Sequence, residues 1–597
     1  MICCILFLVV FVGMIVASIY GYIAGAPWKL IAPIDGDNRI CGYTDGLEDY
    51  TKLYIADIDD AAQPSSAATF SVFDYGVCVK SCPETTTEAI ECKTTSEVGT
   101  CTKGSRYTTT EFLSYCLPNY DSLPSAVQAN WESLMKSVSN SSFGEFFADI
   151  MISKWVILIS VFIAALTTFL YSWFMNYCAQ VLSWISVVLI QIMLVGIGYF
   201  AWDYRRDQIA DDANYEDESM ATWLRWITWL SWIMAGIYYI VIVCNFQSLR
   251  LAVAVISTAS SFVADSKRLL LVPLLYFVLA IAASVLFLCG LVCVSSIGDI
   301  TAGSAAFQTK DIIWTTSTEY IFYGMVFGFC WVLAFIMAMN EFVTIVAAIT
   351  WYYSDKEIPD DDGIPGDSDV SIGMWWSIRY HGGTLAFGSF ILAIVWVIRI
   401  IFEYISKKME DASGNNGCTK CLVSCCRCCL ACFDRFIRYL NRNAYIYAAL
   451  SGEGFCTSAI NSFILILKNA AKFGFVEGIA GCFMFIAKFF ISTATTLVSF
   501  FIMRCMVKVS SPYAPLLIIF IFSYIVSSIF IEIFDTGANT ILQCYILDRE
   551  VLCDDEHIPR SLRKFFSDAE IQKAMAADKT SDIREPLNQD GGANVMH

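Results

Sequence analysis

The sequence predicts an all-α fold, a polytopic α-helical membrane protein with about ten transmembrane helices and a disulfide-bearing first extracellular or lumenal loop. Three observations carry this prediction. Of the 597 residues, 57% are hydrophobic and 16% are charged, whereas a soluble domain has about 25% charged residues. Several apolar runs exceed the ~18 residues that indicate a membrane span. The loop after the first run holds an even number of cysteines, which is typical of disulfide-bonded extracellular segments.

The apolar runs define the expected elements in order. The first span covers residues 1–24, and a large polar loop follows at 25–152. The transmembrane core, residues 153–404, is expected to hold spans two to eight. These lie at about 153–175, 179–201, 223–245, 269–295, 313–337, 340–353 and 382–404. The segment 340–353 is short for a span, since fourteen residues rise only ~21 Å against a ~30 Å hydrocarbon core. The last two helices are expected within 477–534.

Charge and cysteine patterns predict the orientation. The loop 25–152 is acidic, and its disulfide candidates are Cys41, Cys78, Cys82, Cys92, Cys101 and Cys116. Asn140 opens an Asn-Ser-Ser triplet, a candidate glycosylation site. If 340–353 spans the membrane, the basic segment 405–476 is cytosolic, in agreement with the positive-inside rule. Both termini, including the tail 535–597, are then expected in the cytosol, and the membrane is the plasma membrane or that of an organelle.

The segment 405–476 has two parts. The first is rich in cysteine and basic residues, and cytosolic cysteines near a span are typical sites of palmitoylation. The lipidation candidates are Cys425, Cys426, Cys428 and Cys429. Inert thiols are the alternative, and the short gaps between the cysteine pairs disfavour zinc. The second part places Arg435, Arg438 and Arg442 between apolar residues at helical spacing, which predicts an amphipathic helix on an anionic membrane surface.

The residues favour transport or binding over catalysis. The sequence has three histidines and lacks a Walker-type phosphate loop and a zinc-protease helix, so we expect a non-enzyme without a cofactor or metal. The net charge of −18 argues against a nucleic-acid partner and leaves membrane lipids as the expected surroundings. Aromatic faces attract quaternary ammonium ions, and a carboxylate at membrane depth usually faces a cavity or a partner. The substrate-binding candidates are Trp229, Trp331, Glu341, Trp351, Tyr352 and, as a proton-linked group, His381. Packing at the membrane or its interface is the alternative for each.

Two motifs in the second half of the chain carry a family resemblance. The first consists of His381, Gly383, Ala386, Phe387, Gly388, Ser389, Arg399, Glu403 and Tyr404. The second consists of Asn441, Arg442, Asn443, Ala444 and Tyr445, followed by the stretch 455–459. Both resemble signatures of the choline transporter-like family of solute carriers. The resemblance implies a ten-span carrier that transports choline, and in some members ethanolamine, in exchange for protons. The small residues of the first motif also predict a close helix contact, and Glu403 is expected to pair with Arg399 one turn earlier.

One departure from the family pattern supports a second hypothesis. Ile345 and Val346 stand where the family usually has a small Ala-Gly pair, and bulky residues close a helix approach that small ones permit. The alternative function is therefore a structural or lipid-organising subunit of a larger membrane assembly, with protein partners in that assembly.

Overall fold

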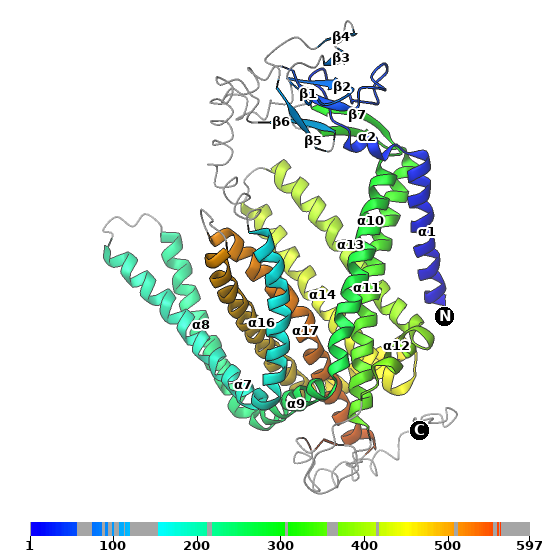
Figure 1. The fold of residues 1–597 in the computed structure, drawn as a ribbon. Coiled ribbons are helices and arrows are strands. Elements are labelled where there is room, and N and C mark those ends of the chain that lie inside the picture. Colours follow the sequence, from blue (N-terminus) through cyan, green and yellow to red (C-terminus); the bar gives the residue numbers. More distant parts are fainter. Residues whose placement is uncertain are drawn as a thin grey trace.

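The structure is a computed structural model that describes most of the chain. The described residues are 2–56, 75–85, 90–93, 98–100, 107–112, 114–119, 153–211, 218–304, 309–354, 368–413, 417–506, 512–552, 558–559 and 562. Long helices form a bundle, and a small β-sheet unit lies at one end of it (Figure 1). The disulfide candidate Cys101 lies outside the described residues. The glycosylation candidate Asn140 also lies outside them.

Ten of the described helices are long and apolar enough to cross a membrane, which confirms the predicted fold class. A helix satisfies its own backbone hydrogen bonds, so it is the usual way for a chain to cross lipid. Helix α7 (Lys154–Asp211) supplies two of the ten, Lys154–Met175 and Tyr177–Arg206. The others are α1 (Ile2–Ala24), α8 (Glu218–Cys244), α9 (Phe246–Asp265), η3 with α10 (Lys267–Leu271 and Val272–Ser295), α11 (Thr316–Tyr352), α13 (Gly382–Ser413), α16 (Ala470–Met506) and α17 (Tyr513–Leu547).

The first loop folds into a six-stranded sheet with the order β4-β3-β2-β1-β6-β5. Its strands are β1 (Lys52–Ile55), β2 (Gly76–Val79), β3 (Glu91–Lys93), β4 (Val98–Thr100), β5 (Thr109–Phe112) and β6 (Tyr115–Pro118). All pairs are antiparallel except β1 with β6. Disulfides join Cys41 to Cys78 and Cys82 to Cys116, and Cys92 is also disulfide-bonded. These bonds confirm the predicted disulfide-bearing loop.

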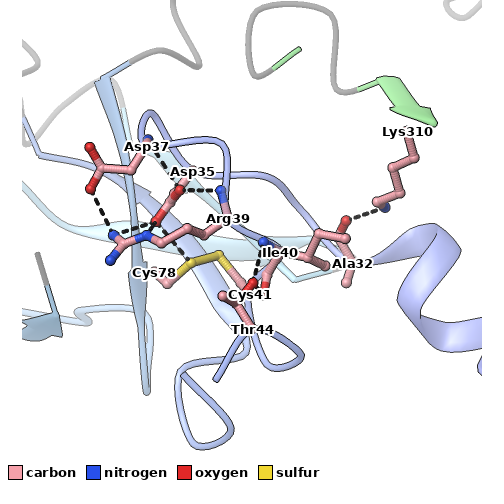
Figure 2. Close-up of a disulfide and its surroundings, with 9 residues drawn as sticks. All are labelled: Ala32, Asp35, Asp37, Arg39, Ile40, Cys41, Thr44, Cys78 and Lys310. Carbon is pink, nitrogen blue, oxygen red and sulfur yellow. Dashed lines mark hydrogen bonds and ion pairs between the residues drawn. A yellow bond between two sulfur atoms is a disulfide. The ribbon is translucent and has the colours of Figure 1, made fainter. Parts of the chain in front are cut away.

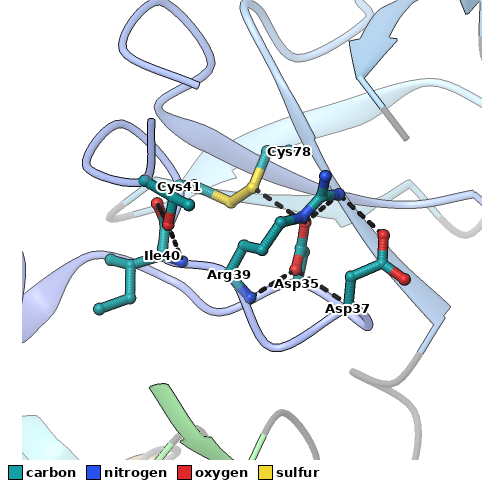
Figure 3. Close-up of polar contacts among 7 residues, drawn as sticks. Asp35, Asp37, Arg39, Ile40, Cys41 and Cys78 are labelled. Atoms are coloured by element: carbon teal, nitrogen blue, oxygen red, sulfur yellow. Dashed lines mark hydrogen bonds and ion pairs between the residues drawn. A yellow bond between two sulfur atoms is a disulfide. The ribbon is translucent and has the colours of Figure 1, made fainter. Parts of the chain in front are cut away.

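Polar contacts hold the base of this sheet unit together (Figure 3). The buried Asp35 carboxylate accepts bonds from the backbone N–H of Arg39 at 2.8 Å and from the Arg39 Nε–H at 2.9 Å. Burial raises the pKa of Asp35, and the Arg39 contacts oppose that rise. Asp35 therefore fixes the turn that leads into the Cys41–Cys78 disulfide.

A hairpin between α10 and α11 ties the sheet unit to the bundle. It consists of β7 (Asp299–Ser304) and β8 (Thr309–Ile313). Lys310 Nζ donates to the carbonyl oxygen of Leu30 at 2.6 Å, near the end of α2 (Pro27–Ile31). It also donates to the carbonyl oxygen of Ala32 at 2.5 Å (Figure 2). Burial lowers the pKa of Lys310 to about 8.

Helix α11 differs from the predicted pair of spans. The sequence suggested separate spans at 313–337 and 340–353, whereas residues 316–352 form one helix. Thr315 caps its start by accepting a bond from the Thr318 N–H. Neither glycine nor proline occurs between 329 and 352, so nothing in the chain interrupts the helix.

A packed end layer lies at the end of the bundle opposite the sheet (Figure 1). It consists of α9, α12 (Val370–Arg379), residues 343–352 of α11 and residues 536–547 of α17. Nearly all of the residues that α11 and α17 contribute to this layer are buried. The sequence predicted a loop at 246–268, but residues 246–265 form the amphipathic helix α9. Its buried face packs on α7, α16 and α17.

Helix α14 (Gly417–Ser451) runs alongside α13 through the bundle. Glu403 pairs with Arg427, Trp396 Nε1 donates to Asp434 at 3.2 Å, and Asn441 Nδ2 donates to the Gly388 carbonyl at 2.9 Å. Along these three contacts the residue numbers of α13 decrease while those of α14 increase, so the two helices are antiparallel. The structure therefore differs from the expected surface helix, and α15 (Phe455–Lys468) follows it at an angle of 107°.

The contacts of α13 place its first residues beside the end layer. His381 lies next to Phe342, and Ser389 next to Trp331, so α13 rises antiparallel to α11 toward the sheet. Residues 403–413 of α13 and 417–427 of α14 therefore lie near the sheet end (Figure 1). Glu403 does not pair with Arg399 as expected. It accepts two bonds from Arg427, at 3.0 and 2.8 Å, because α14 brings that guanidinium against it.

Candidate functional site

Three helices meet at a cluster of charged side chains inside the bundle. Arg442 of α14 donates from Nε to Glu341 of α11 at 2.6 Å and from Nη1 to Asp535 of α17. The three side chains retain 16%, 20% and 20% of their exposure, respectively. The cluster is thus largely enclosed, yet water-sized molecules reach it.

Helical spacing on α17 extends the cluster. Asp535, Asn539 and Gln543 follow one another at steps of four, which places them on one face of the helix. Asn539 Nδ2 donates to Asp535 Oδ1 at 3.4 Å. On α16, Glu477 interacts electrostatically with Asp535 and Arg442. Four helices therefore contribute to the site.

The charges in this cluster do not balance. Arg442 supplies one positive charge, while Glu341, Asp535 and Glu477 supply three carboxyl groups. With all three ionised, the cluster carries two excess negative charges. An uncompensated charge enclosed between helices is costly, so such a site attracts a cation. Among the described residues, no group of three potential ligands is arranged to hold a metal ion.

Several polar atoms around the cluster are buried without a hydrogen-bond partner. Among the described residues these include Asn340 Oδ1, Asn443 Oδ1, Glu477 Oε2 and both amide atoms of Gln543. An unpaired buried polar atom costs about 1–3 kcal/mol. Bound water or a polar ligand ordinarily removes that cost.

The cluster lies near the start of α13. Asn441, next to Arg442, bonds to Gly388, six residues after the start of α13 at Gly382. Six residues correspond to ~9 Å along a helix. The cluster therefore lies between the spanning part of the bundle and the end layer.

The first family-like motif forms the contact that positions α14. The Tyr445 hydroxyl occupies the space where a Cβ on residue 388 would project, so only glycine fits at Gly388. Trp331 Nε1 donates to the Ala386 carbonyl at 3.0 Å and to Ser389 Oγ at 3.2 Å. The close helix approach predicted from these small residues is present.

The structure does not bring the aromatic candidates together. Trp331 is 1% exposed and packs against other aromatic rings. Trp351 donates to Asp265 at 3.0 Å within the end layer, and Tyr352 donates at 2.8 Å to Asp548, the residue that follows α17. Trp229 lies on α8, 57% exposed, against Trp232.

Of the remaining candidates, Glu341 joins the cluster, whereas His381 packs against Phe342. His381 is 8% exposed, with its ring 4.9 Å from that of Phe342, the residue after Glu341. The lipidation candidates lie on the first half of α14, with Cys425, Cys428 and Cys429 exposed and Cys426 half-buried. They lie away from the cluster, next to the Arg427–Glu403 pair.

Sequence reasoning missed the two other principal members of the cluster. It placed Arg442 on a membrane-surface helix, and Asp535 just beyond the last span. The spacing of Asp535, Asn539 and Gln543 was the available signal, because polar residues at steps of four mark one face of a helix.

Comparisons with known proteins agree with this architecture. Residues 229–550, more than half of the chain, match the family described as plasma-membrane choline transporter. The chain is 24% identical to choline transporter-like protein 2 of Xenopus laevis, over 96% of this chain and 94% of that protein. It is 26% identical to choline transporter-like protein 2 of Mus musculus, over 92% and 91%. It is 25% identical to choline transporter-like protein 1 of Caenorhabditis elegans, over 92% and 84%. The chain therefore belongs to the plasma-membrane choline transporter family.

Proposed function

We propose that the protein is a carrier for choline or a related organic cation, and that the Arg442 cluster compensates the charge of the substrate. One observation carries this proposal, namely that three carboxyl groups face one guanidinium in a partly accessible position inside the bundle. The named relatives are transporters, which supports a transport role over catalysis.

The chemistry of choline fits such a site. A quaternary ammonium cannot lose its charge and has no N–H to donate, so it needs nearby negative charge and aromatic or apolar faces for its methyl groups. Tyr439 and Tyr445 of α14 lie within electrostatic range of Glu477 and Glu341, respectively. Tyr445 is buried against Gly388, which leaves Tyr439 as the aromatic candidate near the carboxylates.

Uptake of radiolabelled choline into proteoliposomes tests the proposal. Asp535→Asn removes one carboxylate of the cluster without changing its shape, and we expect saturable uptake to be lost. Asp434→Asn is the matched control, because Asp434 is buried on α14 but pairs with Arg438 outside the cluster. Equal uptake by the two variants would show that the cluster does not serve transport.

The proposal includes two further points. Ethanolamine is a second substrate, and the substrate is transported in exchange for protons. Ethanolamine carries a primary ammonium, which can donate hydrogen bonds to the same carboxylates. We expect it to compete with choline for uptake. An imposed pH gradient across the liposome membrane tests the exchange, since coupled uptake responds to the gradient and uncoupled uptake does not.

We also propose that α14 crosses the membrane. Of the ten candidate spans, α9 runs across the end of the bundle, and α14 takes its place among the crossing helices. The count of crossings stays at ten. Both termini then lie on the cytosolic side, and the cysteines of α14 lie on the side of the disulfide-bonded sheet. This arrangement disfavours palmitoylation at those cysteines, which is a cytosolic modification at juxtamembrane sites.

A structural subunit of a membrane assembly is the second candidate function. The end layer favours it, because Ile345 and Val346 are both 0% exposed within a continuous core. Uptake no greater than that of empty vesicles, for choline and for ethanolamine, would support this function over transport.

A further inference from the structure

We propose that Arg442 is a built-in competitor of the substrate cation and that Glu477 is the alternative partner to which it moves when substrate binds. This inference rests on the proposed function, because it assumes that a cation binds at the cluster. A simple charge count also predicts that loss of Arg442 strengthens cation binding and that loss of Glu477 weakens it. The inference goes further, because it makes the effect of Glu477 depend on the presence of Arg442.

The first step is the way in which Arg442 is held. Its guanidinium forms one bond with Glu341 and one with Asp535, and these carboxylates belong to different helices. A guanidinium can hold one carboxylate through two parallel bonds, and this strong arrangement is seen between Arg427 and Glu403. Arg442 instead divides its bonds between two carboxylates, in the position that an incoming cation would need.

The second step is the presence of another acceptor nearby. Glu477 interacts electrostatically with Arg442, and its Oε2 atom is buried without a hydrogen-bond partner. An arginine released from Glu341 and Asp535 needs a new acceptor, since leaving its donors unpaired is costly. Glu477 offers that acceptor within the cluster.

The third step is charge conservation. Choline brings one positive charge to Glu341 and Asp535 as the guanidinium takes its own charge to Glu477. Before binding, one guanidinium serves Glu341 and Asp535 while Glu477 has no counter-charge of its own. After the transfer, choline and Arg442 each have a carboxylate partner, and the excess negative charge of the three ionised carboxylates falls from two to one. Because Arg442 links α14 to α11 and α17, its transfer to α16 also changes which helices are joined. Substrate binding is thereby coupled to helix movement, as an alternating-access carrier requires.

Equilibrium binding of radiolabelled choline to the full chain in lipid nanodiscs tests the inference. Arg442→Gln removes the competitor, so we expect the Kd for choline to fall at least about threefold while uptake slows. Glu477→Gln removes the alternative partner, so we expect the Kd to rise about tenfold. In the double variant the Glu477 effect should disappear, since no arginine then needs the acceptor. Arg438→Gln, one turn earlier on α14 and outside the cluster, is the matched control.

The outcomes separate this inference from the proposed function. No saturable choline binding by the wild-type protein contradicts the proposed function itself. Binding by the wild type together with a higher Kd for Arg442→Gln overturns the competitor role. A Glu477→Gln effect of the same size with and without Arg442 overturns the transfer. If Arg442→Gln does not fold, Arg442→Lys replaces it, because a shorter, single-point cation competes less well. A higher Kd for that variant also overturns the inference.

Discussion

The course of α14 gives a prediction that separates the structure from the interpretation of the sequence. From Cys425 to Ser451 the helix rises 26 residues, or ~39 Å at 1.5 Å per residue. This exceeds the ~30 Å hydrocarbon core of a bilayer. The ends of this segment should therefore lie on opposite sides of the membrane, with Cys425 on the side of the sheet.

Single-cysteine variants and a membrane-impermeant maleimide measure this directly in intact cells. The free cysteines are replaced by serine, and either Cys425 is kept or Ser451→Cys is introduced. Lys80→Cys, at an exposed position directly after β2 of the sheet unit, reports the reference side. We expect Cys425 and Lys80→Cys to be labelled before permeabilisation and Ser451→Cys only after it. Labelling of Cys425 and Ser451→Cys from the same side would refute the crossing. It would support the cytosolic location that the sequence predicts for segment 405–476.

Three further predictions concern single residues. Gly388→Ala places a methyl group against the Tyr445 hydroxyl and should destabilise the protein by about 1–3 kcal/mol in thermal unfolding, whereas Gly474→Ala, in open space, should not. His381→Ala should change the pH dependence of choline uptake if His381 is proton-linked, and an unchanged profile assigns it to packing. Lys310 has a folded pKa of about 8, below its ordinary 10.5, so the folded state binds fewer protons between these values. Stability should therefore rise as the pH increases from 8 to 10.5, and this rise should be absent in Lys310→Met, as measured by thermal unfolding across that range.

Hydropathy and cysteine pairing predicted the fold class, because spans and disulfides are local properties of the chain. The course of α14 was not predicted, since its arginines lower the hydropathy of the segment. Their partners explain why the helix tolerates them inside the bundle. Arg442 finds Glu341 at a separation of 101 residues and Asp535 at 93. Such pairs exist only in the folded structure.

The candidate site was predicted only in part for the same reason. Glu341 was identified because a carboxylate inside an apolar run is unusual in any context. Trp331 and Tyr352 were selected for the chemistry of their side chains, but the structure gives their polar atoms partners in the protein, Ala386 and Asp548. Aromatic composition alone does not distinguish packing from a binding wall.

The central claim is that the carboxylates around Arg442 bind a quaternary ammonium ion. At ~5 Å and an effective dielectric constant of about 20, each carboxylate attracts a monovalent cation by about 3 kcal/mol. The residual exposure of 20% at Glu341 and Asp535 weakens this attraction through solvent screening. When both carboxylates are removed, we expect the affinity for choline to fall at least about tenfold.

The most direct test is equilibrium binding of radiolabelled choline to the protein in nanodiscs, comparing the wild type with the Glu341→Gln/Asp535→Asn double variant. The Glu403→Gln variant, which alters the Arg427 pair near the sheet end, is the control. We predict saturable binding by the wild type and the control, and a Kd raised at least about tenfold in the double variant. Equal affinity in all three proteins would contradict the account.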